Sequence, residues 1–210
     1  MRRGTIVNLN KVKVFDAIIK NRLIIIVALC FLIGAVSGSI AFGSETKLFD
    51  ISEKIFKSYL SVRLGKSVFS ILISSFLFAA SVLVGMFLCG SSMLGVVLSP
   101  LAVFFGGFFC GSFCSYLYSQ FSLKGIAFNA VIIIPSFIIL IVCIIFSACD
   151  SVKFSLVLAK LTLPSTYPVN LYLDFKRYCG RYLIFVALCL ISGLVDSVLS
   201  HSFLKLFDLS

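Results

Sequence analysis

The stretch GSSMLGVVLSPLAVFFGGFFCGSFCSYLYSQFSLKGIAFNAVIIIP, residues 90–135, decides the fold of this chain. Lys124 is its only charged residue, and most of its other positions are apolar or small. One membrane-spanning helix needs about 20 residues, and this apolar run is far longer. The stretch therefore predicts two membrane helices joined by a short turn at residues 122–125.

The composition of the whole chain agrees with a membrane location. Of 210 residues, 60% are hydrophobic and 12% are charged, whereas an ordinary soluble domain has about 25% charged residues; the mean hydropathy is +1.17. We expect an all-α fold, a polytopic transmembrane helix bundle of about five spans with interfacial amphipathic helices. It would form a single membrane domain over residues 1–210.

Polar and basic segments separate the apolar runs and give the order of elements. A basic cytoplasmic leader (1–22) precedes the first span, an extracytoplasmic amphipathic helix (43–66) follows it, and a cytoplasmic interfacial loop (149–181) precedes the last span. The predicted spans are residues 23–42, 67–88, 93–121, 126–148 and 182–200.

The basic residues indicate orientation and lipid contact. With the N-terminus cytoplasmic and the C-terminus extracytoplasmic, the cytoplasmic side carries the larger share of the 18 Lys and Arg residues, as the positive-inside rule requires. The net charge of +10 then reflects helix ends that meet anionic lipid. No basic stripe interleaved with aromatic residues indicates nucleic acid binding. We expect a multi-pass protein of the cell membrane.

Small residues recur four positions apart in two of the predicted spans. Gly34 and Gly38 share one face of the first span, and Gly107 and Gly111 share one face of the third, where Gly106 adds a further glycine. Faces of this kind let helix backbones approach closely. The pattern predicts helix packing, within the chain or between copies in a homo-oligomer.

Two prolines fall inside predicted spans. Pro100 lies in the third span and Pro135 in the fourth, and each removes a backbone hydrogen bond from its helix. Such breaks can create ligand or ion sites in transporters. Because no ionisable side chain accompanies these breaks, we favour a packing role for both prolines.

Residues 43–66 have the pattern of an amphipathic helix. Apolar side chains recur at spacings of three and four, from Leu48 through Ile51, Ile55 and Tyr59 to Val62, and charged residues occupy the rest of the circumference. Such a helix can lie on the lipid surface or dock a partner protein. For the docking alternative, the predicted partner-binding residues are Ile51, Ile55 and Tyr59.

The residue types that catalysis needs are scarce. His201 is the only histidine, and the sequence has no nucleophile elbow, phosphate loop or dinucleotide fingerprint. Cys110 and Cys114 share a helix face, but neither His nor a carboxylate is near them in the sequence. We therefore predict no enzyme activity and no catalytic, cofactor or metal site. Asp196, the one acid inside an apolar run, is a candidate proton site, although its position near the helix end favours a structural role.

The order of small residues and prolines in residues 90–148 also follows a known pattern. A Gly-rich span, a turn of the form SQFSLKG and a proline-containing helix come in succession; the residues involved are Gly95, Pro100, Gly106, Gly107, Gly111, 119–125 and Pro135. In these features the chain resembles the stage II sporulation protein M family.

This resemblance implies a non-enzymatic membrane scaffold that assembles peptidoglycan hydrolases at the septum for engulfment during endospore formation. The packing glycines and the amphipathic helix around Ile51, Ile55 and Tyr59 would then carry the function. The alternative from a different class is a small permease or the membrane subunit of an ATPase-driven exporter. A third interpretation is a membrane protein whose amphipathic helices only sense lipid.

Overall fold

The computed structural model describes residues 22–43, 46–162 and 171–203, and nearly all of these residues are helical. No strand occurs in the described ranges. The all-α fold class is therefore confirmed. The helices are α2 (Arg22–Phe42), α3 (Thr46–Arg63), α4 (Val68–Gly90), α5 (Gly95–Phe128), the π-helix η1 (Asn129–Ile133), α6 (Ile134–Thr162) and α7 (Leu171–Phe203).

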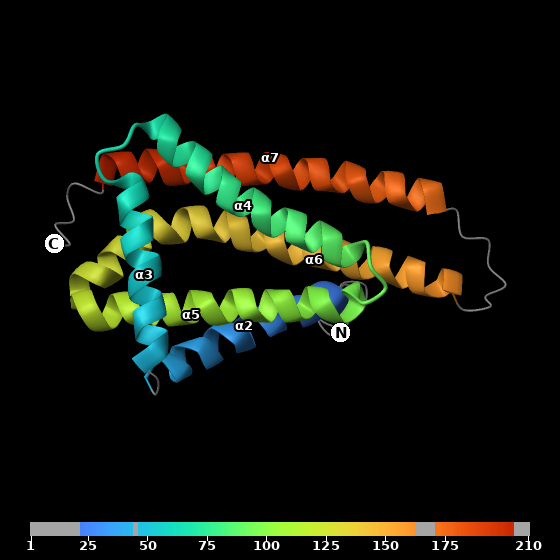
Figure 1. Ribbon diagram of the computed structural model, residues 1–210, viewed down its shortest axis with the longest axis horizontal. Helices are drawn as coiled ribbons and strands as arrows, with labels where there is room; N and C mark the ends of the chain where they lie inside the picture. The colour runs from blue at the N-terminus through green and yellow to red at the C-terminus, as the bar shows by residue number, and fades with distance from the viewer. Residues whose placement is uncertain (1–21, 44–45, 163–170, 204–210) are drawn as a thin grey trace, which may run out of the picture.

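The long helices lie side by side as a bundle (Figure 1). α2, α4, α5, α6 and α7 run roughly along the longest axis of the molecule, whereas α3 crosses the bundle near one end. Among the described residues, four helical segments are long and apolar enough to cross a membrane: Arg22–Phe42, Val68–Gly90, Gly95–Ala159 and Leu171–Phe203.

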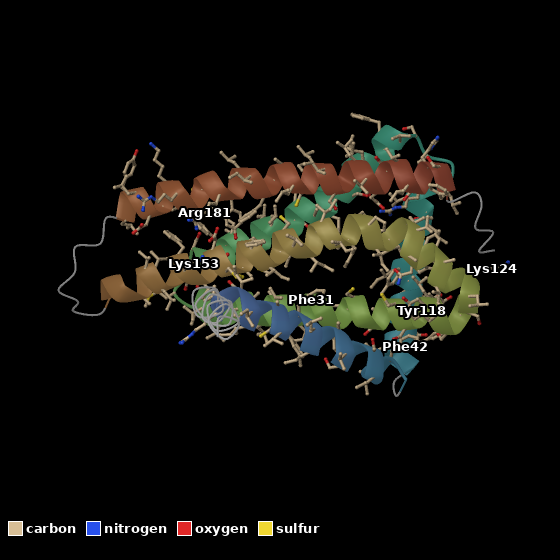
Figure 2. The ribbon with its side chains drawn as sticks, turned by 180° about the vertical axis from the view of Figure 1, so that it is seen from behind. Phe31, Phe42, Tyr118, Lys124, Lys153 and Arg181 are labelled. Carbon is tan, nitrogen blue, oxygen red and sulfur yellow. The ribbon has the colours of Figure 1, made fainter. Side chains whose placement is uncertain are left out.

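The third of these segments contains a reversal of the chain. At about 1.5 Å per residue, its 65 residues would form a rod more than twice the about 30 Å thickness of the bilayer core. Ser122 interrupts it with φ 46° and ψ −124°, angles that non-glycine residues rarely adopt. Beyond it, Gly125 lies against the Leu117 carbonyl, so α5 ends by folding back on itself. Lys124 lies at this end of the bundle (Figure 2).

The glycine faces of the first and third predicted spans meet each other. A Cβ atom on Gly34 or Gly38 would come within 3.0 Å of the Phe104 or Phe108 carbonyl oxygen of α5. Gly107 and Gly111 of α5 lie equally close to carbonyl oxygens of α2. The Ser112 hydroxyl also donates to the Gly38 carbonyl oxygen at 3.1 Å. The two backbones are therefore in direct contact, which is the arrangement that small residues four apart permit.

Two of the predicted packing residues, Gly106 and Pro100, differ from the glycines that form the contact between α2 and α5. Gly106 is exposed, and a Cβ on it would meet no described atom within 4 Å, because it lies about 100° around the helix from Gly107. Pro100 lies within α5, where Ser122 is the residue with non-helical angles. The helix therefore continues through Pro100, and the predicted break there does not form.

Pro135 lies at a change in helix type. It is the second residue of α6, directly after the five-residue π-helix η1. A proline cannot donate a backbone hydrogen bond, so the regular α-helical pattern is interrupted here, and π-turns occur mostly as single-turn bulges inside α-helices. The predicted irregularity in the fourth span therefore occurs, as a wider helical turn before the proline.

The prediction of an interfacial loop at residues 149–181 was wrong in its secondary structure. α6 continues to Thr162 and α7 already begins at Leu171, with residues 163–170 outside the described residues. Some apolar side chains of this region, among them Val152, Phe154 and Tyr178, are buried between helices. Phe154 and Tyr178 stack with ring centroids 4.6 Å apart, and the Ser151 and Tyr182 hydroxyls lie 2.7 Å apart. The predicted leader, residues 1–22, lies outside the described residues except for Arg22.

Replacing Gly111 by Leu should destabilise the bundle. A side chain there meets the Ala35 backbone of α2, so the helices must separate, at a cost of about 1–3 kcal/mol by comparison with overpacked cores. The measurement is the midpoint of thermal unfolding in detergent. Gly106→Leu is the matched control, because its side chain enters open space. An equal loss of stability in both variants would contradict the contact described here.

Candidate functional site

The α3 helix has an inner face packed on the bundle and an outer face that is exposed. Ser52 and Phe56 are buried on the inner side. Phe56 contacts a cluster of aromatic rings from α5, including Tyr116 at 5.8 Å and Phe121 at 5.3 Å between ring centroids, as well as Phe128. These contacts hold α3 across the ends of the long helices rather than beside the bundle.

The three predicted partner-binding residues do not share one face. Ile51 and Ile55 are 43% and 45% exposed, and Lys54 between them is exposed as well. Tyr59 instead packs against the Phe128 ring at 6.4 Å. Residues four apart on a helix drift by about 40°, so Tyr59 is rotated from Ile51 toward the bundle. The outer face therefore carries the isoleucines without the tyrosine.

A buried ion pair fixes the C-terminal end of α3. The Arg63 Nη2 atom lies 2.5 Å from Asp196 Oδ2, and the two side chains are 10% and 7% exposed. Arg63 is the last residue of α3, and Asp196 belongs to α7. Because each charge is removed from water, the pair is stabilising only if its remaining hydrogen-bonding capacity is also met.

Neighbouring hydroxyl groups meet much of that capacity. The Ser75 hydroxyl of α4 donates to Asp196 Oδ2, while the Tyr59 and Ser200 hydroxyls lie 3.4 Å from Oδ1. Both carboxyl oxygens therefore have donors, and these come from α3, α4 and α7. We call Tyr59, Arg63, Ser75, Asp196 and Ser200 the polar anchor.

Arg63 and Tyr59 also support each other within α3. The guanidinium carbon lies 3.5 Å from the centre of the Tyr59 ring, a cation–π arrangement, and Arg63 Nη1 donates to the Tyr59 carbonyl oxygen at 3.2 Å. Burial raises the pKa of the Tyr59 phenol well above its ordinary value. The phenol therefore stays protonated and remains a donor for Asp196. The Arg63 Nε atom has no hydrogen-bond partner among the described residues.

The polar anchor shows what the sequence interpretation missed. The sequence marks Asp196 by itself as a proton site or a structural group, and it gives no role to Arg63 or Ser75. The helical spacing of α3 does indicate a buried cation. Arg63 lies on the same side of the helix as Ser52 and Phe56, which is the buried side, and an unpaired cation there would be costly. A buried cation and the one acid of an apolar span are natural partners, and the structure pairs them.

The described residues include no group of three or more His, Cys, Asp and Glu side chains that could hold a metal ion. His201, near the end of α7, is exposed. This arrangement attaches α3 to the bundle by its inner face, and its outer face carries apolar side chains together with charges of both signs.

The apolar helices, their glycine contact and the anchored crossing helix define a multi-pass helical membrane protein. The family model described as stage II sporulation protein M matches residues 27–201. The chain therefore belongs to the stage II sporulation protein M family and is a sporulation-related membrane protein. No curated protein and no solved structure matches it.

Removing one member of the buried ion pair should destabilise the protein strongly. Arg63→Met leaves Asp196 without its cation, and a buried pair broken in this way costs about 3–5 kcal/mol. The double variant Arg63→Met with Asp196→Leu should recover much of that loss, because no charge is left buried. The midpoint of unfolding in detergent measures both effects.

Lys57→Gln is the control for this experiment. It removes an ion pair of the same helix, between Lys57 and Glu53 at 2.6 Å, which is exposed to solvent. Exposed pairs contribute little, so we expect no change in the midpoint. A double variant as unstable as Arg63→Met alone would argue against the ion pair as the origin of the effect.

Proposed function

We propose that this protein is a non-enzymatic membrane scaffold that assembles peptidoglycan hydrolases at the septum, so that the wall is thinned for engulfment during endospore formation. Membership of the stage II sporulation protein M family supports a role in this process. The observation that carries the scaffold proposal is the α3 helix, which is anchored on one side and open on the other.

The anchoring suits a docking function. A helix attached only by its apolar face could roll or slide on the bundle, whereas the ion pair of Arg63 with Asp196 sets its position along and around its own axis. Ile51 and Ile55 are consequently held outward. A pre-ordered surface loses less conformational entropy when a partner binds, so the outer face of α3 is a favourable place for a partner protein.

The chemistry of this face indicates the kind of partner. Two isoleucines one helical turn apart form an apolar ridge, and charges of both signs flank it: Asp50 and Lys54 are exposed, and Lys57 is paired with Glu53 at 2.6 Å. A complementary partner would offer a shallow apolar groove with charged residues of both signs at its rim, in the manner of helix recognition. The predicted orientation, with a cytoplasmic N-terminus, places α3 on the extracytoplasmic side, where wall hydrolases act.

The transport alternative receives less support from the described residues. An acid that carries protons or ions must be able to exchange its partners. Asp196 instead accepts from Arg63, Ser75, Tyr59 and Ser200 at the end of the bundle, an arrangement typical of a structural group. The scaffold proposal uses Asp196 in that structural role.

A photo-crosslinking amino acid placed at Ile55 should capture wall hydrolases in sporulating cells. The residue is 45% exposed, on the outer face of α3. The matched control is the same amino acid at Leu77, an exposed apolar residue in the middle of α4. Products are identified by mass spectrometry after purification through a tag.

The proposal requires hydrolases in the Ile55 products and not in the Leu77 products. Replacing Ile51 by Ser should then reduce the yield, because it removes half of the apolar ridge. Lipid as the main product at both positions would contradict docking and favour a helix that only lies on the membrane. An ATPase subunit in place of hydrolases would contradict the scaffold and favour an exporter.

A further inference from the structure

A second surface feature lies at the opposite end of the bundle from α3. It is a groove of about 320 Å³ between the start of α2, the later part of α6 and the early part of α7. In Figure 2, Lys153 and Arg181 lie at this end, on α6 and α7, and Lys124 lies at the other. The packed cluster that contains Val27, Met86 and Cys149 lies beside it.

The groove has a charged part and an apolar part. Arg181 Nη1 lies 2.7 Å from Asp150 Oδ1, and Lys153 Nζ lies 3.5 Å from the same oxygen. The apolar part is formed by Ile24 of α2, with Phe146, Ile184 and Phe185 of the neighbouring helices. Polar and apolar contacts thus come together on one small surface.

The charges of the groove do not cancel. Two cationic side chains share one carboxylate, so the residues that line the groove retain one positive charge. Asp150 is buried, whereas Arg181 and Lys153 are 54% and 57% exposed. The carboxylate therefore holds the two cations in place, while their remaining donors face outward.

These donors match a phosphate group. Asp150 is contacted through the Nη1 atom of Arg181, and a guanidinium has five N–H donors in a planar fork that fits phosphate oxygens. An ammonium group such as that of Lys153 adds a point charge with three donors. Basic pockets between membrane helices are a known setting for anionic lipid headgroups.

We propose that the groove binds an anionic phospholipid, with its phosphate at Arg181 and Lys153 and an acyl chain along Ile24, Phe146 and Ile184. The volume of about 320 Å³ is at the lower end of small-molecule sites, which begin near about 300 Å³. It accommodates a headgroup, and the chains continue over the exposed side chains of Ile184 and Phe146.

The apolar part of the groove favours a phospholipid over a free phosphate ion as the ligand. A soluble anion would use the two cations and leave Ile184 and Phe146 exposed, whereas a lipid covers them at the same time. The position of the groove between long apolar helices puts it within reach of lipid. The proposal is independent of hydrolase docking, because it concerns the other end of the bundle.

Native mass spectrometry of the full chain in detergent tests the site. Phosphatidylglycerol and phosphatidylcholine with identical acyl chains are titrated separately, and the fraction of protein with one bound lipid is measured. We expect tighter binding of phosphatidylglycerol. Lys153→Gln should weaken it by about fivefold, which corresponds to about 1 kcal/mol per basic residue near a membrane surface, and should leave phosphatidylcholine unchanged.

Matched variants keep the result interpretable. Lys153→Gln leaves the pair of Arg181 with Asp150 intact, and an unchanged unfolding midpoint confirms a folded protein. Arg181→Lys retains the charge beside Asp150 but loses the fork, so it should also weaken phosphatidylglycerol. Lys54→Gln removes an exposed cation from α3, at the other end of the bundle (Figure 1), and should have no effect on lipid binding.

Three results would overturn the proposal. Equal binding of the two lipids would remove the role of charge, and equal effects of Lys153→Gln and Lys54→Gln would remove the role of the groove. Displacement of phosphatidylglycerol by an equal concentration of glycerol 3-phosphate would show that phosphate alone is recognised. Weakened binding in Ile184→Ser would support the acyl-chain contact.

Discussion

Backbone contact between α2 and α5 is the constraint on which both ends of this molecule depend. Gly34 and Gly38 face carbonyl oxygens of α5, and Gly107 and Gly111 face those of α2, so neither helix can shift without placing a Cβ atom against a backbone. At one end of the bundle, α2 is followed by α3. At the other end, Ile24 of α2 lines the groove between α6 and α7. Packing in the middle thus sets the geometry of both surfaces.

Burial of a complete polar group fixes the crossing helix. The ion pair of Arg63 with Asp196 would be unfavourable without its hydroxyl partners, because desolvation of two charges costs several kcal/mol per ion. With donors on both carboxyl oxygens, it becomes a specific joint among α3, α4 and α7. Apolar contacts of Phe56 hold the helix on the bundle, and the polar anchor decides where along the bundle it lies.

The two surfaces differ in the same way that their proposed ligands differ. The outer face of α3 is an apolar ridge flanked by charges of both signs, and nothing encloses it in the described structure; it suits a protein with a groove of its own. The Asp150 region is concave, with cations held by a buried carboxylate and an apolar wall; it suits a phosphate with a hydrocarbon chain. Under the two proposals, the first surface would bind partner proteins and the second would bind an anionic lipid.

Local patterns in the sequence by themselves determined the helical class, the glycine faces and the amphipathic character of α3, because hydropathy and spacing four apart act within a single helix. The tertiary structure decided which elements meet. It turned Tyr59 inward and left Gly106 outside the contact. It also continued α6 to Thr162, began α7 at Leu171, and paired Arg63 with Asp196, far away in the chain. A polar residue on a helix can be exposed to solvent, or it can be buried and hydrogen-bonded to a partner far away in the chain. Its neighbours in the sequence do not distinguish these two states, because the packing of other helices decides which of them is lower in free energy.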